Sequence, residues 1–86
     1  MEPERISFPV EYPVKVVARA NPDLRLQVDA AFLRHFGPMA ADRVSERPSA
    51  HSNFVALTYV PVVQSEAQLQ ALHADLKLVT GVVMVL

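Results

Sequence analysis

The chain of 86 residues carries hydrophobic patterns of two kinds, one typical of strands and one typical of helices. Residues 12–19 (YPVKVVAR) and 53–61 (NFVALTYVP) are rich in β-branched and aromatic residues. In each range, apolar residues recur at every second position and would lie on the same side of a strand. This period of two predicts a strand over each range, and 81–86 (GVVMVL) predicts a last strand. Residues 40–47 (AADRVSER) are more polar. They predict a short edge strand that its charges protect and that Pro48 ends.

A first helix is predicted between the two longest strands. Asn21 can cap free backbone N–H groups, Pro22 suits the first helical position, and Asp23 favours the positive end of the helix dipole. Gly37-Pro38 stops the helix. The apolar residues that recur at helical spacing, and so predict its buried side, are Leu24, Val28, Ala31, Phe32 and His35 or Phe36.

A second helix is predicted to begin at Ser65, with Gln68 three residues later at the spacing of a capping box. Thr80-Gly81 breaks it. Its predicted buried stripe comprises Leu69, Leu72, Leu76 and Val79.

The order of these elements is β-α-β-β-α-β. Two right-handed β-α-β halves of this kind form an α+β, ferredoxin-like sandwich, with a four-stranded antiparallel sheet and both helices on one face. We predict a single domain over residues 12–86, since the chain is long enough for one small domain only. The Pro- and charge-rich residues 1–11 predict an irregular lead-in.

Composition excludes several classes of function. The net charge is −1 with acids and bases interspersed, and the strand NFVALTYVP lacks the basic residue of an RNA-stacking surface, so nucleic acid is not a predicted partner. The absence of cysteine excludes disulfides and thiolate metal sites. No apolar run approaches the ~20 residues of a membrane span. The N-terminus does not resemble a signal peptide, so we predict a cytoplasmic location.

The stretch 47–53 (RPSAHSN) is the first candidate for chemistry. Serine, asparagine and proline are turn residues, and a hairpin tip offers no group to orient His51 as a general base, so we predict no catalytic residue and no enzyme. A small ligand such as an amino acid or carboxylate remains an alternative. The residues predicted to bind it are Asn21, Arg47, Ser49 and His51.

Other polar residues predict neither a metal nor a cofactor. The histidines at 35, 51 and 73 have no spacing of metal ligands, and two glycines cannot build a phosphate-binding loop. The helical carboxylates predict helix-start and solvent-facing charges: Asp23, Asp29, Glu66 and Asp75.

The feature that most favours a function is a sheet face without polar alternation. A sheet covered on one side should alternate apolar with polar residues, and the third and fourth strands do not. With Val55, Leu57, Tyr59, Val82, Met84 and Leu86 facing the helices, the predicted outer patch comprises Val17, Phe54, Ala56, Thr58, Val60, Val83 and Val85. Such a patch is typical of an interface with a second copy or another protein. The alternative is that residues 1–11 cover it.

Several motifs in this order also match a known family. They are Phe8-Pro9, the strand from Tyr12 to Val17, Pro22 to Leu24, Arg34-His35, Pro48-Ser49, Asn53-Phe54, and Val82 with Met84 to Leu86. On these residues the chain resembles the YbeD-like proteins, small bacterial proteins of unassigned function. The resemblance implies a ferredoxin-like fold similar to regulatory domains that bind amino acids. This chain departs from the family at His51-Ser52, where a Lys-Gly pair is expected.

Overall fold

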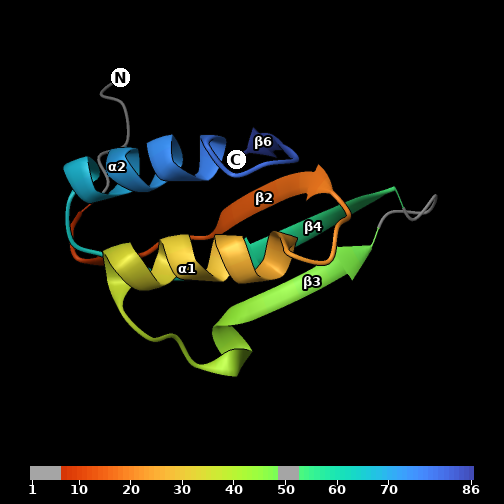
Figure 1. Cartoon of the computed structure of the whole chain (residues 1–86). Helices are drawn as coiled ribbons and strands as arrows, with labels where there is room; N and C mark the ends of the chain where they lie inside the picture. The colour runs from red at the N-terminus through yellow and green to blue at the C-terminus, as the bar shows by residue number, and fades with distance from the viewer. Residues whose placement is uncertain (1–6, 49–52) are drawn as a thin grey trace, which may run out of the picture.

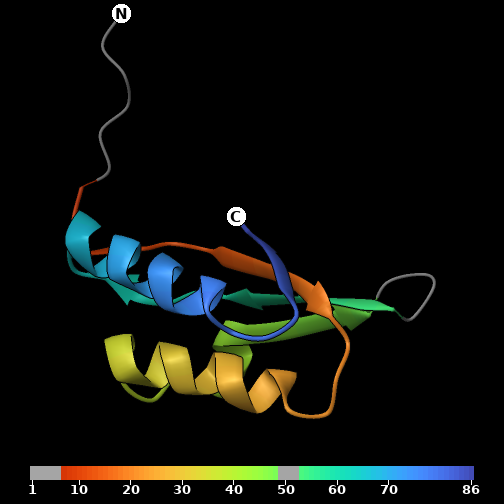
Figure 2. The ribbon, with the colours of Figure 1, turned by 45° about the horizontal axis from the view of Figure 1, so that its top comes forward.

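The computed structural model describes residues 7–48 and 53–86 and has the predicted order of elements (Figure 1). Its main sheet is antiparallel throughout, with strand order β3-β4-β2-β6, and both helices lie side by side on one face (Figures 1 and 2). This confirms the ferredoxin-like α+β fold. The main elements are β2 (Val14–Arg19), α1 (Leu24–Phe36), β3 (Val44–Pro48), β4 (Phe54–Tyr59), α2 (Glu66–Lys77) and β6 (Val82–Val85).

Two short strands form a second sheet next to the first. β1 (Val10–Glu11) pairs antiparallel with β5 (Val62–Val63). The predicted irregular lead-in over 1–11 therefore contains a strand, in which residues 10 and 11 pair with 62 and 63. Residues 1–6, which the alternative of a covered outer face also invokes, lie outside the described residues. The prediction of one strand over 40–47 is partly wrong, because a 3₁₀ turn, η1 (Ala41–Arg43), precedes β3.

The helix ends follow local rules, with one difference. Ser65 Oγ accepts from the Gln68 N–H at 3.2 Å, as predicted, and Gly37 closes α1 at φ +76° with its N–H on the Leu33 carbonyl. At the start of α1, Asp23 occupies the N-cap. Asn21 Oδ1 instead accepts from the Asp23 N–H at 3.0 Å, which makes a turn that leads into the helix.

The core lies between the helix layer and the inner side of the sheet. The Phe32 and Tyr59 rings stack with centroids 3.9 Å apart. Leu69 and Val79 of the predicted α2 stripe are partly buried against this core. Its buried residues are Val14, Val16, Ala18, Leu24, Val28, Ala31, Phe32, Val55, Leu57, Tyr59, Leu72 and Leu76. No helix among the described residues has the length and hydropathy needed to cross a membrane.

The predicted alternation of the last strand is wrong beyond Val82. In the register with β2, Val82 pairs with Ala18, Met84 with Val17 and Val85 with Val16, so Val83 is one residue too many. An extra residue in one of two paired strands is the definition of a β-bulge, and it shifts by one position which side chains face inward. Val85 consequently packs against the core, and Met84 and Leu86 lie on the outer side.

Two leucines in the first turn of α1 test this core. Leu24 is 2% exposed and Leu26 is 74% exposed, so both replacements by alanine change helix propensity equally but burial differently. We expect Leu24→Ala to lower the free energy of unfolding by about 2–5 kcal/mol. Leu26→Ala should change it by less than about 0.5 kcal/mol. Urea denaturation followed by circular dichroism measures both, and equal losses would contradict the packing described.

Candidate functional site

The helix-free face of the sheet has an apolar centre with cations around it. Val17 lies in the middle of this face, paired with Ala56 on one side and Met84 on the other. The surrounding positions add Lys15, Arg19 and Arg47, together with Ser45, Phe54, Thr58 and Leu86. None of the described side chains that the strand registers place on this face is a carboxylate. The face is therefore positive although the chain as a whole is slightly acidic.

A hollow of about 250 Å³ lies on this face between β2, β4 and β3. Lys15 and Arg47 line it together with the hydroxyl-bearing Ser45 and Thr58. Glu46 also lines it, but the Glu46 carboxylate accepts a hydrogen bond from Arg25 of α1. Two cations and two hydroxyl donors form a surface suited to an anionic group. At the other end of the face, the Arg19 guanidinium carbon lies 5.5 Å from the centre of the Phe54 ring, a cation–π contact.

The structure places most of the predicted interface residues on this face. Val17, Phe54, Ala56 and Thr58 lie there and are partly buried, and Val60 follows β4 directly with similar burial. Val83 is 57% exposed at the bulge. The predicted outer position of Val85 is wrong for the reason given above, and Met84 takes its place. Whether these residues bind a partner stays a prediction.

The four predicted ligand-binding residues do not gather into one described site. Arg47 lines the hollow on the helix-free face, whereas Asn21 lines a separate hollow of about 170 Å³ on the helix side. Ser49 and His51 lie outside the described residues, so the prediction that 47–53 is a turn without a site stays a prediction. The hollow beside Asn21 is also lined by Arg25 and Glu46, which form an ion pair, so the cation there is already bound to a carboxylate.

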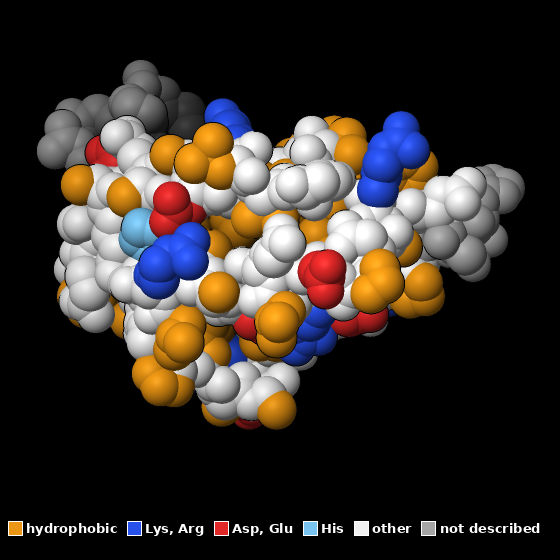
Figure 3. All heavy atoms as spheres, in the orientation of Figure 1, with side chains coloured by type: hydrophobic (Ala, Val, Ile, Leu, Met, Phe, Trp, Pro, Cys, Tyr) orange, Lys and Arg blue, Asp and Glu red, His pale blue; other side chains and the backbone are white. Residues whose placement is uncertain are grey.

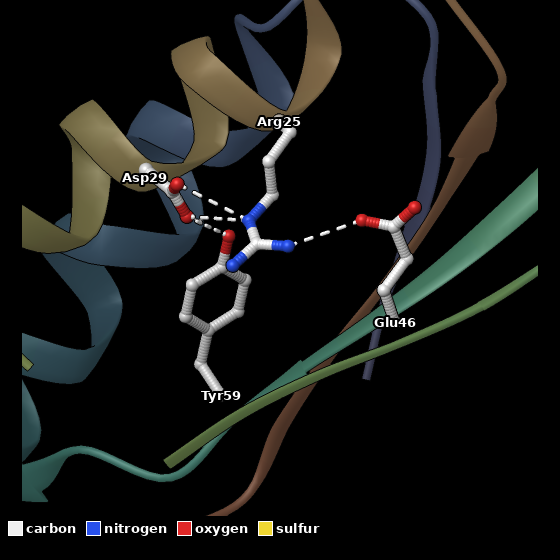
Figure 4. Close-up of polar contacts among 4 residues, drawn as sticks. All are labelled: Arg25, Asp29, Glu46 and Tyr59. Atoms are coloured by element: carbon white, nitrogen blue, oxygen red, sulfur yellow. Dashed lines mark hydrogen bonds and ion pairs between the residues drawn. The ribbon is translucent and has the colours of Figure 1, made fainter. Parts of the chain in front are cut away.

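A polar cluster that the sequence analysis missed lies between α1 and the sheet (Figure 4). Arg25 Nε donates to both oxygens of Asp29, at 3.0 and 3.1 Å, and Arg25 Nη1 donates to Glu46 Oε1 at 3.1 Å. The Tyr59 hydroxyl donates to Asp29 from below. Asp29 is thus not simply a solvent-facing charge. The sequence did contain an indication of this cluster, because a tyrosine at an inward strand position needs a hydrogen-bond partner.

Burial and hydrogen bonding shift the pKa values of two groups in this cluster. Removal of the Tyr59 ring from water raises the pKa of its hydroxyl well above the usual range, and the hydrogen bond to Asp29 raises it further. The same Asp29 carboxylate raises the pKa of Arg25 through its hydrogen bond. Tyr59 is therefore a fixed donor at all ordinary pH values, and the cluster holds one cation and two carboxylates.

The two helices are joined by another polar contact. His35 Nε2 lies 2.6 Å from Asp75 Oδ2, and Gln68 Nε2 donates to the His35 carbonyl at 2.7 Å. The hydrogen bond with His35 lowers the pKa of Asp75, and the nearby Arg34 lowers it further. The sequence pattern indicated His35 only as a possible residue of the buried side of the first helix, and it did not predict this partner. Among the described residues no three His, Cys, Asp or Glu side chains are grouped to hold a metal ion.

Comparison with known proteins gives one family and one related fold. The family model described as "Protein of unknown function (DUF493)" matches residues 3–86. A UPF0250 protein of Ectopseudomonas mendocina is 34% identical over 100% of this chain and 95% of its own length. Another, from Hahella chejuensis, is 32% identical over 99% of this chain and 93% of its own length. These matches confirm the resemblance to YbeD-like proteins.

A solved structure shares the fold. The solution structure of the C-terminal domain of the MgtC protein from Mycobacterium tuberculosis has a TM-score of 0.65, covering 95% of this chain and 89% of that chain. At 22% identity the match supports the ferredoxin-like arrangement and carries no function across.

The raised pKa of Tyr59 predicts loss of stability at alkaline pH. Above pH ~10 the unfolded chain releases the tyrosine proton while the folded chain keeps it, so the free energy of unfolding falls with rising pH. We expect Tyr59→Phe to flatten this fall, measured by urea denaturation between neutral and alkaline pH. Tyr12→Phe is the matched control and should retain it. An unchanged slope in Tyr59→Phe would contradict the described environment.

The lowered pKa of Asp75 predicts the opposite dependence. Its contribution to stability is present above the unfolded pKa of ~3.9 and is lost as pH falls through the lower folded value. Asp75→Asn should therefore be less stable than the original chain near neutral pH, with the difference shrinking in acid. Asp42→Asn on η1 provides the control, and a constant difference at every pH would contradict the pairing with His35.

Proposed function

Because the chain belongs to the DUF493 family, whose description assigns no activity, we propose its function from the surface: a non-catalytic interaction module. Its partner is a protein that binds the helix-free face and carries acidic residues around an apolar patch. The observation that carries this proposal is the composition of that face. Apolar residues occupy its centre, cations surround them, and the described strand positions on that side carry no carboxylate.

Charge favours a different protein over a second copy. Face-to-face stacking of two copies would bring Lys15, Arg19 and Arg47 of each toward the same cations of the other. Like charges across an interface cost affinity, whereas an acidic partner gains both attraction and faster association. The hollow between Lys15 and Arg47 suits a carboxylate side chain of such a partner. The predicted location of the protein remains the cytoplasm, and the charges of this face argue neither for nor against it.

Site-specific photo-crosslinking tests the proposal in the native host. A benzoylphenylalanine at position 56 on the helix-free face should form a crosslink to an acidic protein. The same probe at position 26, which is 74% exposed on the helix layer, should not. A crosslink to a second copy, or equal crosslinking from both positions, would contradict the proposal.

Charge reversal sharpens this test. We expect Arg47→Glu to weaken binding of the crosslinked protein by about tenfold or more, because it places an acid against the partner's acids. Lys77→Glu, in the last turn of α2, makes the same charge change on the helix layer and should leave binding intact. Reversal of the partner's facing acid should restore binding to Arg47→Glu. If Arg47→Glu binds as tightly as the original chain, and reversal of the partner's acid does not change its binding, the electrostatic basis of the proposal is wrong.

A further inference from the structure

The cations of the helix-free face differ from the arginines elsewhere in the described structure. Arg25, Arg34 and Arg43 each form an ion pair with a carboxylate, at 3.0, 3.5 and 2.6 Å. Figure 3 shows the helix side of the molecule, where charged side chains of opposite sign lie next to each other. By contrast, no ion pair within residues 7–48 and 53–86 involves the cations of the helix-free face, which are Lys15, Arg19 and Arg47. Their charges are therefore available to acidic groups of a partner.

The strand registers determine how these three cations are spaced. Lys15 and Arg19 are four residues apart on β2, which places their Cα atoms about 13 Å apart on the same side of the sheet. Val17 lies midway between them and pairs with Ala56 of β4, which in turn pairs with Arg47 of β3. The three cations thus form a triangle around two small apolar residues, and its longest side runs along β2.

The centre of this face lies lower than its borders. Along the middle, the side chains are short: Val17, Ala56 and Thr58. On the β6 side the longer side chains of Met84 and Leu86 extend beyond them and are 47% and 58% exposed. Arg47 extends on the β3 side, and the hollow of about 250 Å³ lies between Arg47 and Lys15. The face is therefore a shallow trough that follows β2 and β4.

An α-helix suits this trough better than an extended segment. A single extended chain laid across the apolar centre would cover its own backbone N–H and C=O groups without hydrogen-bond partners, whereas a helix satisfies them internally. A helix with its side chains is about 10 Å wide, which is the width of two strands at about 4.8 Å each. Two turns of helix, about seven residues, advance about 10.5 Å, so acidic side chains at i and i+7 can reach Lys15 and Arg19.

We propose that the partner binds this face with one amphipathic α-helix that lies along β2 and β4. Two acidic residues about two turns apart contact Lys15 and Arg19, and the apolar residues i+3 and i+4 between them cover Val17 and Ala56. A further acidic residue on the flank of the helix contacts Arg47. This inference rests on the proposed function, and it adds which element of the partner binds and how its residues are spaced.

Two crosslinking positions measure this spacing. Phe54 and Thr58 lie on the helix-free side of β4, four residues and about 13 Å apart. Benzoylphenylalanine is placed at each position in turn, in the full chain in its native host, and the crosslinked partner residues are identified by mass spectrometry. A helix along β4 places these two residues about seven to eleven positions apart, whereas an extended segment places them about four apart. We expect the longer spacing.

A synthetic peptide of the crosslinked segment tests the charges. It is titrated into the ¹⁵N-labelled chain, and amide shifts at 17, 56 and 84 report binding. Glutamine in place of both acids that face Lys15 and Arg19 should weaken binding by about tenfold or more, and glutamine in place of an acid on the solvent side of the same helix is the matched control. Lys15→Gln should remove the effect of losing the acid that faces Lys15, and should retain the effect of losing the acid that faces Arg19.

The outcomes separate this inference from the proposed function. If position 56 yields no acidic protein, both are wrong. If position 56 yields one, three results overturn the helix alone: partner residues about four positions apart, crosslinks from 54 and 58 in separate segments, or no crosslink from either position. Unchanged affinity after replacement of both facing acids, or equal weakening by the solvent-side control, also overturns it.

Discussion

The contact between Phe32 and Tyr59 is the interaction on which the rest of this structure depends. The stacked rings join α1 to β4 at the centre of the core, with both side chains 1% exposed. The tyrosine hydroxyl cannot reach water there, so it donates to Asp29, and Asp29 in turn holds Arg25. One buried aromatic residue therefore fixes the height of the helix above the sheet and the position of the polar cluster.

The two faces of the sheet differ in chemistry because only one is covered. On the helix side, apolar packing leaves a cavity beside the edge strand β3, which lacks large inward side chains. The polar cluster of Arg25, Asp29 and Glu46 next to it is negative by one charge. On the helix-free side, the same strands present Val17 and Ala56 among cations. Alternation of side chains along β2 and β4 separates these two surfaces.

Much of the fold followed from local pattern. Alternation predicted β2 and β4, and the spacing of Ser65 and Gln68 predicted the start of α2. The prediction failed at β6, where the bulge at Val83 exchanges the sides of Met84 and Val85. Five consecutive apolar residues carry no polar position that would have revealed the shift. The predicted ligand residues come from two turns, 19–23 and 47–53, that were expected to form one site, whereas Asn21 and Arg47 line different hollows.

The sequence by itself determined the main elements, their order and the inward side of the longer strands, because these depend on residues one to four positions apart. Only the tertiary structure decided the polar contacts between different elements. Tyr59 and Asp29 are 30 residues apart, Arg25 and Glu46 are 21 apart, and His35 and Asp75 are 40 apart. Such pairs form only after α1 packs on the sheet and beside α2, so no residue spacing in the sequence predicts them. The cavity has the same origin, since it is the space that this packing leaves unfilled.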